Sequence, residues 1–575
     1  MADNVVLRIG GKAGTGLVTA TDILTTIALK LGYHIFSSKD YASQIRGGHN
    51  NHTIRITKEN VNTDADKIDL LIAFDQLTLD KHVKSVKENG IVLINENIKF
   101  EKTNKINFIT INILEIEEKL NQKNLHNAVF SGAVAKCLGF PWDVYESIII
   151  DRFNQKKELL KVFKEASLLG YNQTKVFFNY SQQKTNGNLS LISGNDAISL
   201  GALKAGLTFH AQYPMTPVTG ILHFLEKESV TNKKLIVIQP EDEISTINMA
   251  LGASYAGARA MTATSGGGFA LMVESLGLAG MAEIPLVIIE GQRPGPSTGL
   301  PTKTEQGDLK FVINAGTGDF PLTVIAPSTI EECYTETKRA FYFAEKYQLP
   351  VIVLVDKHLT ESFKTVDLNT EEKEFTFDYT KRINIITNIK DNQLNEDGLF
   401  KRYDSKETGR TLPGTTRGIY TCAGDEHNSV GQITEDPKIR IEMVNRRLEK
   451  TKLIEKELPL PELIGPENAD LTIVSWGSNR GAISEAVEVL NQSSKEGKKI
   501  NFLNIKYMLP FQKEEIKSLL SKSKKLLLIE NNIIGQLGQV IAENTGILIE
   551  NKFLKYNGQT FNVNEICQEV KRWLS

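Results

Sequence analysis

The segment Ala211-Gln212-Tyr213-Pro214-Met215-Thr216-Pro217 lies at the end of a predicted strand, 207–212, and decides how the chain is read. The two prolines that flank Thr216 fix the backbone torsion φ, and each removes a backbone N–H donor. Such a turn holds the hydroxyl of Thr216 in one place. Taken alone, the segment also fits a stiff turn between a strand and a helix that has no function.

A second segment follows the apolar run 286–290 and reads Gly291-Gln292-Arg293-Pro294-Gly295-Pro296-Ser297-Thr298-Gly299-Leu300-Pro301-Thr302. In an open parallel sheet, ligands bind beyond the carboxyl ends of the strands, where this loop begins. The guanidinium of Arg293 offers paired donors that match a carboxylate, and neighbouring hydroxyl groups add further donors. The loop therefore predicts a site for a small organic acid, with an ordinary surface arginine on a turn as the alternative.

Two further motifs lie between these loops. Pro240 and the acidic triplet 241–243 suit the start of a helix, because carboxylates are stabilised at the positive end of the helix dipole. The helix that follows is rich in alanine and glycine. Residues 262–268, Thr-Ala-Thr-Ser-Gly-Gly-Gly, then turn from a strand through three glycines, which leave room for a ligand beside the backbone. Helix caps and a flexible turn are the alternative interpretations.

At 575 residues the chain is too long for one hydrophobic core, so several α/β domains are expected. Alternating strand and helix signals predict parallel sheets. The formal net charge of -2 makes nucleic acid an improbable partner. The predicted division is an α/β domain at 1–180, a second at 189–367, a connector at 368–465 and a third α/β domain at 466–575.

The sequence shows neither a signal peptide nor an apolar stretch of about 20 residues that could span a bilayer. We therefore expect a cytoplasmic protein that does not bind membranes. Its four cysteines lie far apart, without the paired spacing of a zinc or iron-sulfur site, so no metal is assigned to this chain. Arg446, Arg447, Lys450 and Lys452 are interpreted as a solvated helix face.

Together these motifs resemble the pyrimidine-binding domain of the 2-oxoacid:ferredoxin oxidoreductases. The resemblance rests on 213–217, Glu243, 264–267 and 292–306, in the family's order and with about its spacing. Met215 stands in place of the usual isoleucine and Pro294 in place of glycine. The resemblance extends beyond this domain. Residues 1–180 resemble a γ-type domain through the glycines at 10–16 and the segment 44–49. The connector resembles the family through 412–414, 424–427 and 434–437, and the C-terminal domain through 509–511 and 530–536.

The resemblance implies a multidomain α/β fold: a parallel-sheet pyrimidine domain of the thiamine diphosphate fold between a γ-type domain and a transketolase-C-like domain. It implies an oxidoreductase that uses coenzyme A to convert a 2-oxoacid to acyl-CoA and CO2 and passes electrons to ferredoxin. Residues 292–302 look most like the 2-oxoglutarate branch. Pyruvate and branched-chain 2-oxoacids remain open, and Lys303 is a candidate for a distal carboxylate.

The resemblance also assigns roles to residues. Glu243 would hydrogen-bond the aminopyrimidine ring of thiamine diphosphate, which promotes the imino tautomer that deprotonates the thiazolium ring. Thr216 and Arg293 would bind the substrate carboxylate. Tyr213 and Thr302 would line the same pocket, and the adjoining Ser265 and Gly266 would contact the cofactor.

Several required parts are missing from the chain. It has no Gly-Asp-Gly motif for magnesium and diphosphate, and scattered cysteines cannot hold an iron-sulfur cluster. The resemblance places Mg2+ and a [4Fe-4S] cluster on a β subunit, which would share the thiamine diphosphate in an αβ or (αβ)2 assembly. We therefore expect the isolated chain to be inactive.

Alternatives remain for one motif and for the whole chain. The pattern Gly11-x-x-Gly14-x-Gly16 follows a strand and could hold a phosphate at a helix N-terminus, although it is not the dinucleotide fingerprint. The resemblance puts it, with Arg46, near coenzyme A, and a plain tight turn is the alternative. A nicotinamide-dependent dehydrogenase and a non-catalytic assembly subunit are the rival functions. Retention of Thr216, Glu243 and Arg293 argues against the second.

Overall fold

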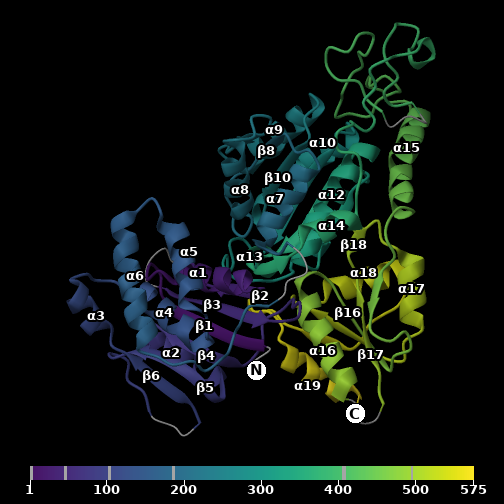
Figure 1. Ribbon diagram of the computed structural model, residues 1–575. Helices are drawn as coiled ribbons and strands as arrows, with labels where there is room; N and C mark the ends of the chain where they lie inside the picture. Colours follow the sequence, from purple (N-terminus) through teal and green to yellow (C-terminus); the bar gives the residue numbers. More distant parts are fainter. Residues whose placement is uncertain are drawn as a thin grey trace. The chain divides into compact units, whose positions relative to one another are not determined.

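The computed structural model describes residues 4–43, 48–101, 105–183, 188–404, 409–493 and 497–574. The chain divides into two units (Figure 1). The first contains Met1–Ser193, Ser362–Asn369 and Asn562–Asn564, and the second contains Gly194–Glu361, Thr370–Phe561 and Glu565–Ser575. The four-part division predicted from the sequence stays a prediction.

An eight-stranded sheet with the order β6-β5-β4-β1-β3-β2-β14-β7 is the centre of the first unit. Its strands are β1 (Asn4–Lys12), β2 (His34–Asp40), β3 (His49–Thr57), β4 (Ile68–Ala73), β5 (Val86–Asn95), β6 (Asn107–Ile111), β7 (Ser190–Ser193) and β14 (Phe363–Val366). Its helices are α1 (Leu17–Lys30), α2 (Gln76–His82), η1 (Val83–Ser85), α3 (Ile113–Leu120), α4 (His126–Leu138), α5 (Trp142–Phe153) and α6 (Lys157–Asn172).

The prediction of a parallel sheet here is correct for only half of it. Strands β1, β4, β5 and β6 are parallel, whereas β3 runs antiparallel to both β1 and β2, and β14 runs antiparallel to β2 and β7. Strand β2 was not predicted. Strand β14 joins β2 from far along the chain, and such a pairing leaves no trace in local periodicity.

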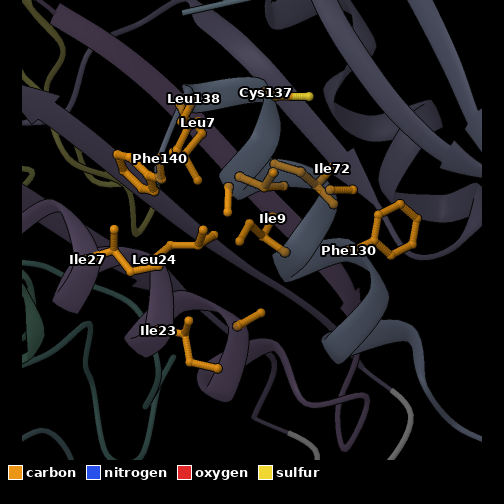
Figure 2. Packing of buried hydrophobic residues seen from close by; sticks show 14 of the residues in the cluster. Leu7, Ile9, Ile23, Leu24, Ile27, Ile72, Phe130, Cys137, Leu138 and Phe140 are labelled. Carbon is orange, nitrogen blue, oxygen red and sulfur yellow. The ribbon is translucent and has the colours of Figure 1, made fainter. Parts of the chain in front are cut away.

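The core of the first unit lies between this sheet and helices α1 and α4 (Figure 2). Leu7 and Ile9 project from β1 against Ile23 and Ile27 of α1, all at most 1% exposed. Gly132 of α4 and Gly170 of α6 let the two helices approach closely, because a Cβ atom at Gly132 would lie 2.0 Å from the backbone oxygen of Ser167. Small residues at this crossing therefore fix how α6 packs.

The second unit contains a seven-stranded sheet with the order β18-β12-β13-β11-β10-β8-β9. Every neighbouring pair is parallel except β12 with β18. The predicted strand 207–212 and the apolar run 286–290 both contribute strands to it, and its parallel pairing confirms the parallel-sheet prediction for this region. The strands of this sheet are β8 (Phe209–Ala211), β9 (Ile236–Ile238), β10 (Ala260–Thr264), β11 (Leu286–Gln292), β12 (Thr323–Ile325) and β13 (Pro350–Asp356), and β18 (Tyr507–Leu509) joins from the C-terminal part.

Helices follow most strands of this sheet. Asp242 caps α9, since its side chain accepts a hydrogen bond from the backbone N–H of Ser245 at 2.8 Å. The helices are α7 (Gly194–Lys204), α8 (Thr219–Ser229), α9 (Glu243–Tyr255), α10 (Gly266–Met281), α11 (Leu309–Ile313), α12 (Ile330–Tyr347) and α13 (Lys357–Glu361). In the ranges described, no helix of the chain has the length and apolar character needed to cross a membrane.

A five-stranded sheet with the order β15-β17-β16-β19-β20 forms the C-terminal part of the second unit. Only β15 runs antiparallel to its neighbour. The strands are β15 (Glu462–Ile464), β16 (Leu471–Ser475), β17 (Ile500–Asn504), β19 (Leu526–Glu530) and β20 (Lys552–Leu554), and the helices are η3 (Gly477–Asn479), α16 (Arg480–Ser493), α17 (Lys513–Ser521), α18 (Gln536–Thr545) and α19 (Val563–Leu574).

The connector contains α14 (Leu368–Glu374), η2 (Asp391–Gln393) and α15 (Pro437–Glu455). The prediction that the basic residues of α15 form a solvated face is wrong for three of the four. Lys450 is buried and Arg446 is partly buried, and both pair with the carboxyl of Glu283, while Arg447 is buried and pairs with Glu426. Periodicity could not show this, because the acidic partners come from distant segments.

Candidate active site

The two loops predicted to bind an organic acid meet at the carboxyl ends of β8 and β11. The Nη1 atom of Arg293 donates a hydrogen bond to the backbone oxygen of Thr216 at 2.9 Å. The Sδ atom of Met215 lies 3.9 Å from the Oγ1 atom of Thr264, at the end of β10. The two loops predicted to bind the substrate and the predicted cofactor segment are therefore neighbours in space.

Glu243 is the first residue of α9 and is 4% exposed. Its Oε1 atom has no hydrogen-bond partner in the described part of the chain. A Cβ atom at Gly268 would lie 2.6 Å from this oxygen, so the backbone of α10 packs directly beside the carboxyl. A buried carboxyl oxygen without a partner is costly, and a bound ligand would satisfy it.

Ser265 is the residue before α10, and its buried Oγ atom is likewise without a partner among the described residues. Gly266, Gly267 and Gly268 form the first turn of this helix, whose unpaired N–H groups give it a positive end. A side chain at Gly267 would meet only open space within 4 Å. A carboxyl, a hydroxyl and exposed backbone N–H groups thus lie together, and they fit a polar heteroaromatic ring.

Tyr213 and Thr302 lie on the same two loops as Thr216 and Arg293. Tyr213 is 37% exposed and Thr302 is 8% exposed. Within the described ranges, neither is hydrogen-bonded to Arg293. Their part in a substrate pocket stays a prediction.

Gln306, the last residue of the motif 292–306, fixes the second loop to the C-terminal part. Its Nε2 atom donates to the backbone oxygen of Trp476 at 3.1 Å, and its Oε1 atom accepts from Nδ2 of Asn479 at 2.8 Å. Its backbone oxygen accepts from Nδ2 of Asn532 at 3.1 Å. This residue is 1% exposed, so the network is shielded from water.

Sequence reasoning also missed two acids near Arg293, the fully buried Glu290 and the partly buried Asp308. Burial, together with neighbouring Asp308, holds the pKa of Glu290 well above its ordinary value, and burial raises the pKa of Asp308 to about 6. In the sequence, Glu290 ends the apolar run 286–290 and was assigned no role. A charged residue inside a fully buried strand was the signal that could have identified it.

The glycine motif lies in the first unit, between β1 and α1. Gly14 has a φ of 88° and Gly16 a φ of 80°, a conformation that side chains rarely adopt. Gly11 packs against Phe74, since a Cβ atom there would lie 2.9 Å from the Cβ atom of Phe74. Arg46, predicted to accompany these glycines, lies outside the described residues.

Comparisons with known proteins agree with this geometry. Residues 200–398 match the family model described as pyruvate flavodoxin/ferredoxin oxidoreductase, thiamine diP-bdg. Residues 6–173 match the model of pyruvate ferredoxin/flavodoxin oxidoreductase, and residues 469–566 match core domain II of pyruvate:ferredoxin oxidoreductase. The α subunit of a 2-oxoacid:ferredoxin oxidoreductase from Saccharolobus solfataricus is 32% identical over 98% of this chain and 96% of its own length.

The chain belongs to the 2-oxoacid:ferredoxin oxidoreductase family, as an α subunit.

Two more relatives place it within this oxidoreductase family. The 2-oxoglutarate oxidoreductase subunit KorA of Mycobacterium tuberculosis is 29% identical, with 100% of this chain and 92% of the relative covered. A solved 2-oxoglutarate:ferredoxin oxidoreductase from Magnetococcus marinus has a TM-score of 0.91 at 28% identity, with both chains fully covered. The resemblance inferred from the sequence is therefore confirmed over the whole oxidoreductase chain, including its thiamine diphosphate-binding domain.

Proposed function

We propose that this chain and a β subunit together catalyse the oxidative decarboxylation of 2-oxoglutarate, with coenzyme A as acyl acceptor and ferredoxin as electron acceptor. The observation that carries the proposal is the meeting of Arg293 and Thr216 near the buried carboxyl of Glu243, whose Oε1 atom has no partner among the described residues. The solved Magnetococcus marinus enzyme is described with 2-oxoglutarate, coenzyme A and succinyl-CoA bound, which supports this choice of substrate.

Arg293 and Thr216 would bind the carboxylate next to the 2-oxo group. One nitrogen of the guanidinium is committed to the backbone of Thr216, which orients the rest of its planar fork. Such a fork pairs with a carboxylate through two parallel hydrogen bonds. Tyr213 and Thr302 would complete the walls of the pocket. This arrangement would hold the 2-oxo carbon toward the carboxyl of Glu243.

The residues around Glu243 would hold the pyrimidine ring of thiamine diphosphate. When bound, this cofactor supplies the nucleophilic carbon that attacks the 2-oxo group and accepts the electrons released with CO2. Glu243 would exchange a proton with the ring nitrogen, for which a carboxyl is required. Ser265 would donate its hydroxyl, and Gly266 would let the ring approach the backbone. The proposal accounts for both unpartnered oxygen atoms.

The β subunit would cover the face formed by α9 and α10, which pack against each other. Ile244 and Met249 on α9 are 50% and 43% exposed, and Leu271 on α10 is 51% exposed. Exposed apolar side chains on small-residue helices are typical of an interface. The diphosphate cradle, Mg2+ and a [4Fe-4S] cluster would belong to that subunit in an αβ or (αβ)2 assembly, since the chain has no Gly-Asp-Gly motif.

In the first unit, the loop with Gly11, Gly14 and Gly16, and Arg46 with it, would bind near the phosphates of coenzyme A. Gly16 precedes α1 and has no side chain that could cap the helix, so the first N–H groups of α1 are available to an anion. A cytoplasmic location is proposed as well. The four cysteines of the chain are free thiols, as is usual for cytoplasmic proteins.

A broader substrate range is the second candidate, because the Saccharolobus solfataricus relative is named for 2-oxoacids in general. The test is to copurify the chain with its β subunit and to measure viologen reduction dependent on coenzyme A across a panel of 2-oxoacids. We expect the highest kcat/KM with 2-oxoglutarate and no activity from either chain alone. Equal rates with pyruvate would move the chain to the broader class, and no reaction with any 2-oxoacid would overturn the proposal.

A further inference from the structure

Glu290 lies at the carboxyl end of β11 and is 0% exposed. It pairs in register with Thr264 of β10, so it stands at the level where the cofactor segment begins. Neither of its carboxyl oxygen atoms receives a hydrogen bond from any described residue. A carboxylate with no donor for either oxygen is too costly to bury, so its charge must be removed.

The group that acts most directly on Glu290 is another carboxyl, that of Asp308. The backbone N–H of Asp308 donates to Oε1 of Gln292 at 3.0 Å, which fixes its position. A Cβ atom at Gly266 would lie 2.5 Å from Oδ2 of Asp308, so this carboxyl adjoins the positive end of α10. Asp308 therefore has a favourable place for a negative charge and Glu290 has none.

We infer that Glu290 and Asp308 share one proton, so that together they carry a single negative charge that positions Arg293 and balances its positive charge. The inference rests on the proposed function in one respect, namely that Arg293 binds the substrate carboxylate. Two neighbouring carboxyl groups ionise together only against strong repulsion, and a proton held between them would give the unpartnered oxygen atoms of Glu290 a hydrogen bond.

The charged groups around the pair agree with this assignment. Burial lowers the pKa of Arg293, whereas Asp308 and Glu290 raise it, so both acids act on the guanidinium. Burial raises the pKa of Glu305, and the neighbouring Asp308 raises it further. On neighbouring elements, β13 contributes Asp356, whose carboxyl accepts from the backbone N–H of Leu359, and α9 contributes Glu243 against Gly268. Arg293 is the cation that opposes the pair.

The shared proton has a consequence for substrate binding. With it, the pair and Arg293 have no net charge. Without it, the loop has a net negative charge beside the site of an anionic substrate. Loss of the proton at alkaline pH should therefore weaken binding of the 2-oxoacid by about tenfold, because one unit charge acts at short range in a partly buried site. Glu290 and Asp308 are positioning residues in this account.

The test uses the complete αβ complex and the KM for the 2-oxoacid from about pH 6.5 to pH 9. In the wild type we expect KM to rise on the alkaline side. Glu290→Gln keeps a neutral donor beside Asp308 but cannot ionise, so its KM should equal the wild-type value near pH 7 and stay flat above it. Glu305→Gln, the control, should keep the alkaline rise.

A second measurement does not depend on activity. Infrared spectra at neutral pH should show one protonated carboxyl band that is lost in Glu290→Gln and retained in Glu305→Gln. An active complex in which Glu290→Gln keeps the alkaline rise, or lacks the infrared change, would overturn the shared proton and leave the proposed function standing. A wild-type complex that oxidises no 2-oxoacid would overturn the proposed function, and the infrared result would still decide the protonation of Glu290.

Discussion

Arg293 donates a hydrogen bond to the backbone oxygen of Thr216 at 2.9 Å, although 77 positions separate the two residues in the chain. The bond uses the main chain of Thr216. No hydrogen bond within the described residues uses its hydroxyl. Two loops from different strands are thereby joined at the sheet edge where parallel strands end, which is where a ligand site is expected.

Replacing Arg293 by lysine should raise KM for the 2-oxoacid by about tenfold or more. Lysine keeps the charge but cannot bind a carboxylate and the Thr216 oxygen with one planar group, and a hydrogen bond to a charged group contributes about 1.5–3 kcal/mol. Steady-state kinetics of the complex measure the change. Arg440→Lys, at an arginine on α15 that is 54% exposed, is the control. An unchanged KM in Arg293→Lys would exclude this residue from the substrate site.

Replacing Gln306 by alanine should loosen the substrate loop from the C-terminal part. The change leaves the Nδ2 atom of Asn479 and the backbone oxygen of Trp476 buried without this partner, and each such group costs about 1–3 kcal/mol. We expect a higher KM and faster proteolysis within 292–306. Gln492→Ala, at an exposed position on α16, should show neither change, and a rigid loop in Gln306→Ala would refute the role.

Replacing Glu283 by glutamine should destabilise the second unit severely. The buried Glu283 opposes Lys450, Arg446 and Arg402, whose charges outweigh its burial and hold its pKa well below the ordinary range. Removing one member of a buried ion network costs about 3–5 kcal/mol. Thermal denaturation followed by circular dichroism measures the loss. Glu449→Gln, in an exposed pair on α15, should leave the melting temperature nearly unchanged.

The stability of the wild type relative to Glu290→Gln should fall as pH rises. The pKa of Glu290 in the folded state lies well above its ordinary value, so folding takes up a proton that the unfolded chain lacks above about pH 4.5. The uptake lowers the free energy of unfolding of the wild type by up to about 1.4 kcal/mol for each pH unit. The glutamine variant takes up no proton at this position and loses nothing there. Melting temperatures between about pH 6.5 and 8.5, where Asp308 is largely ionised, should therefore diverge. A constant difference would show that Glu290 is already ionised.

The sequence was sufficient for the strands and loops that carry the site. Proline and glycine punctuation places Thr216 and Arg293 at strand ends, and a capping pattern places Glu243 at the start of α9. These are local signals. Local signals could not reveal the residues whose roles depend on distant partners, such as Gln306 with Asn479 and Glu283 with Lys450. They also could not reveal that β14 joins a sheet whose other strands lie far away in the sequence.

The central claim, that the buried carboxyl of Glu243 performs proton exchange with the cofactor ring, is tested most directly by Glu243→Gln in the purified αβ complex. Glutamine keeps the shape and a hydrogen bond but cannot exchange the proton, and general acid-base catalysis is typically worth about 10²–10⁴-fold. We predict a loss of kcat in that range while Glu241→Gln, at the exposed neighbouring acid, stays near the wild type. A Glu243→Gln complex that keeps the wild-type kcat would contradict the account.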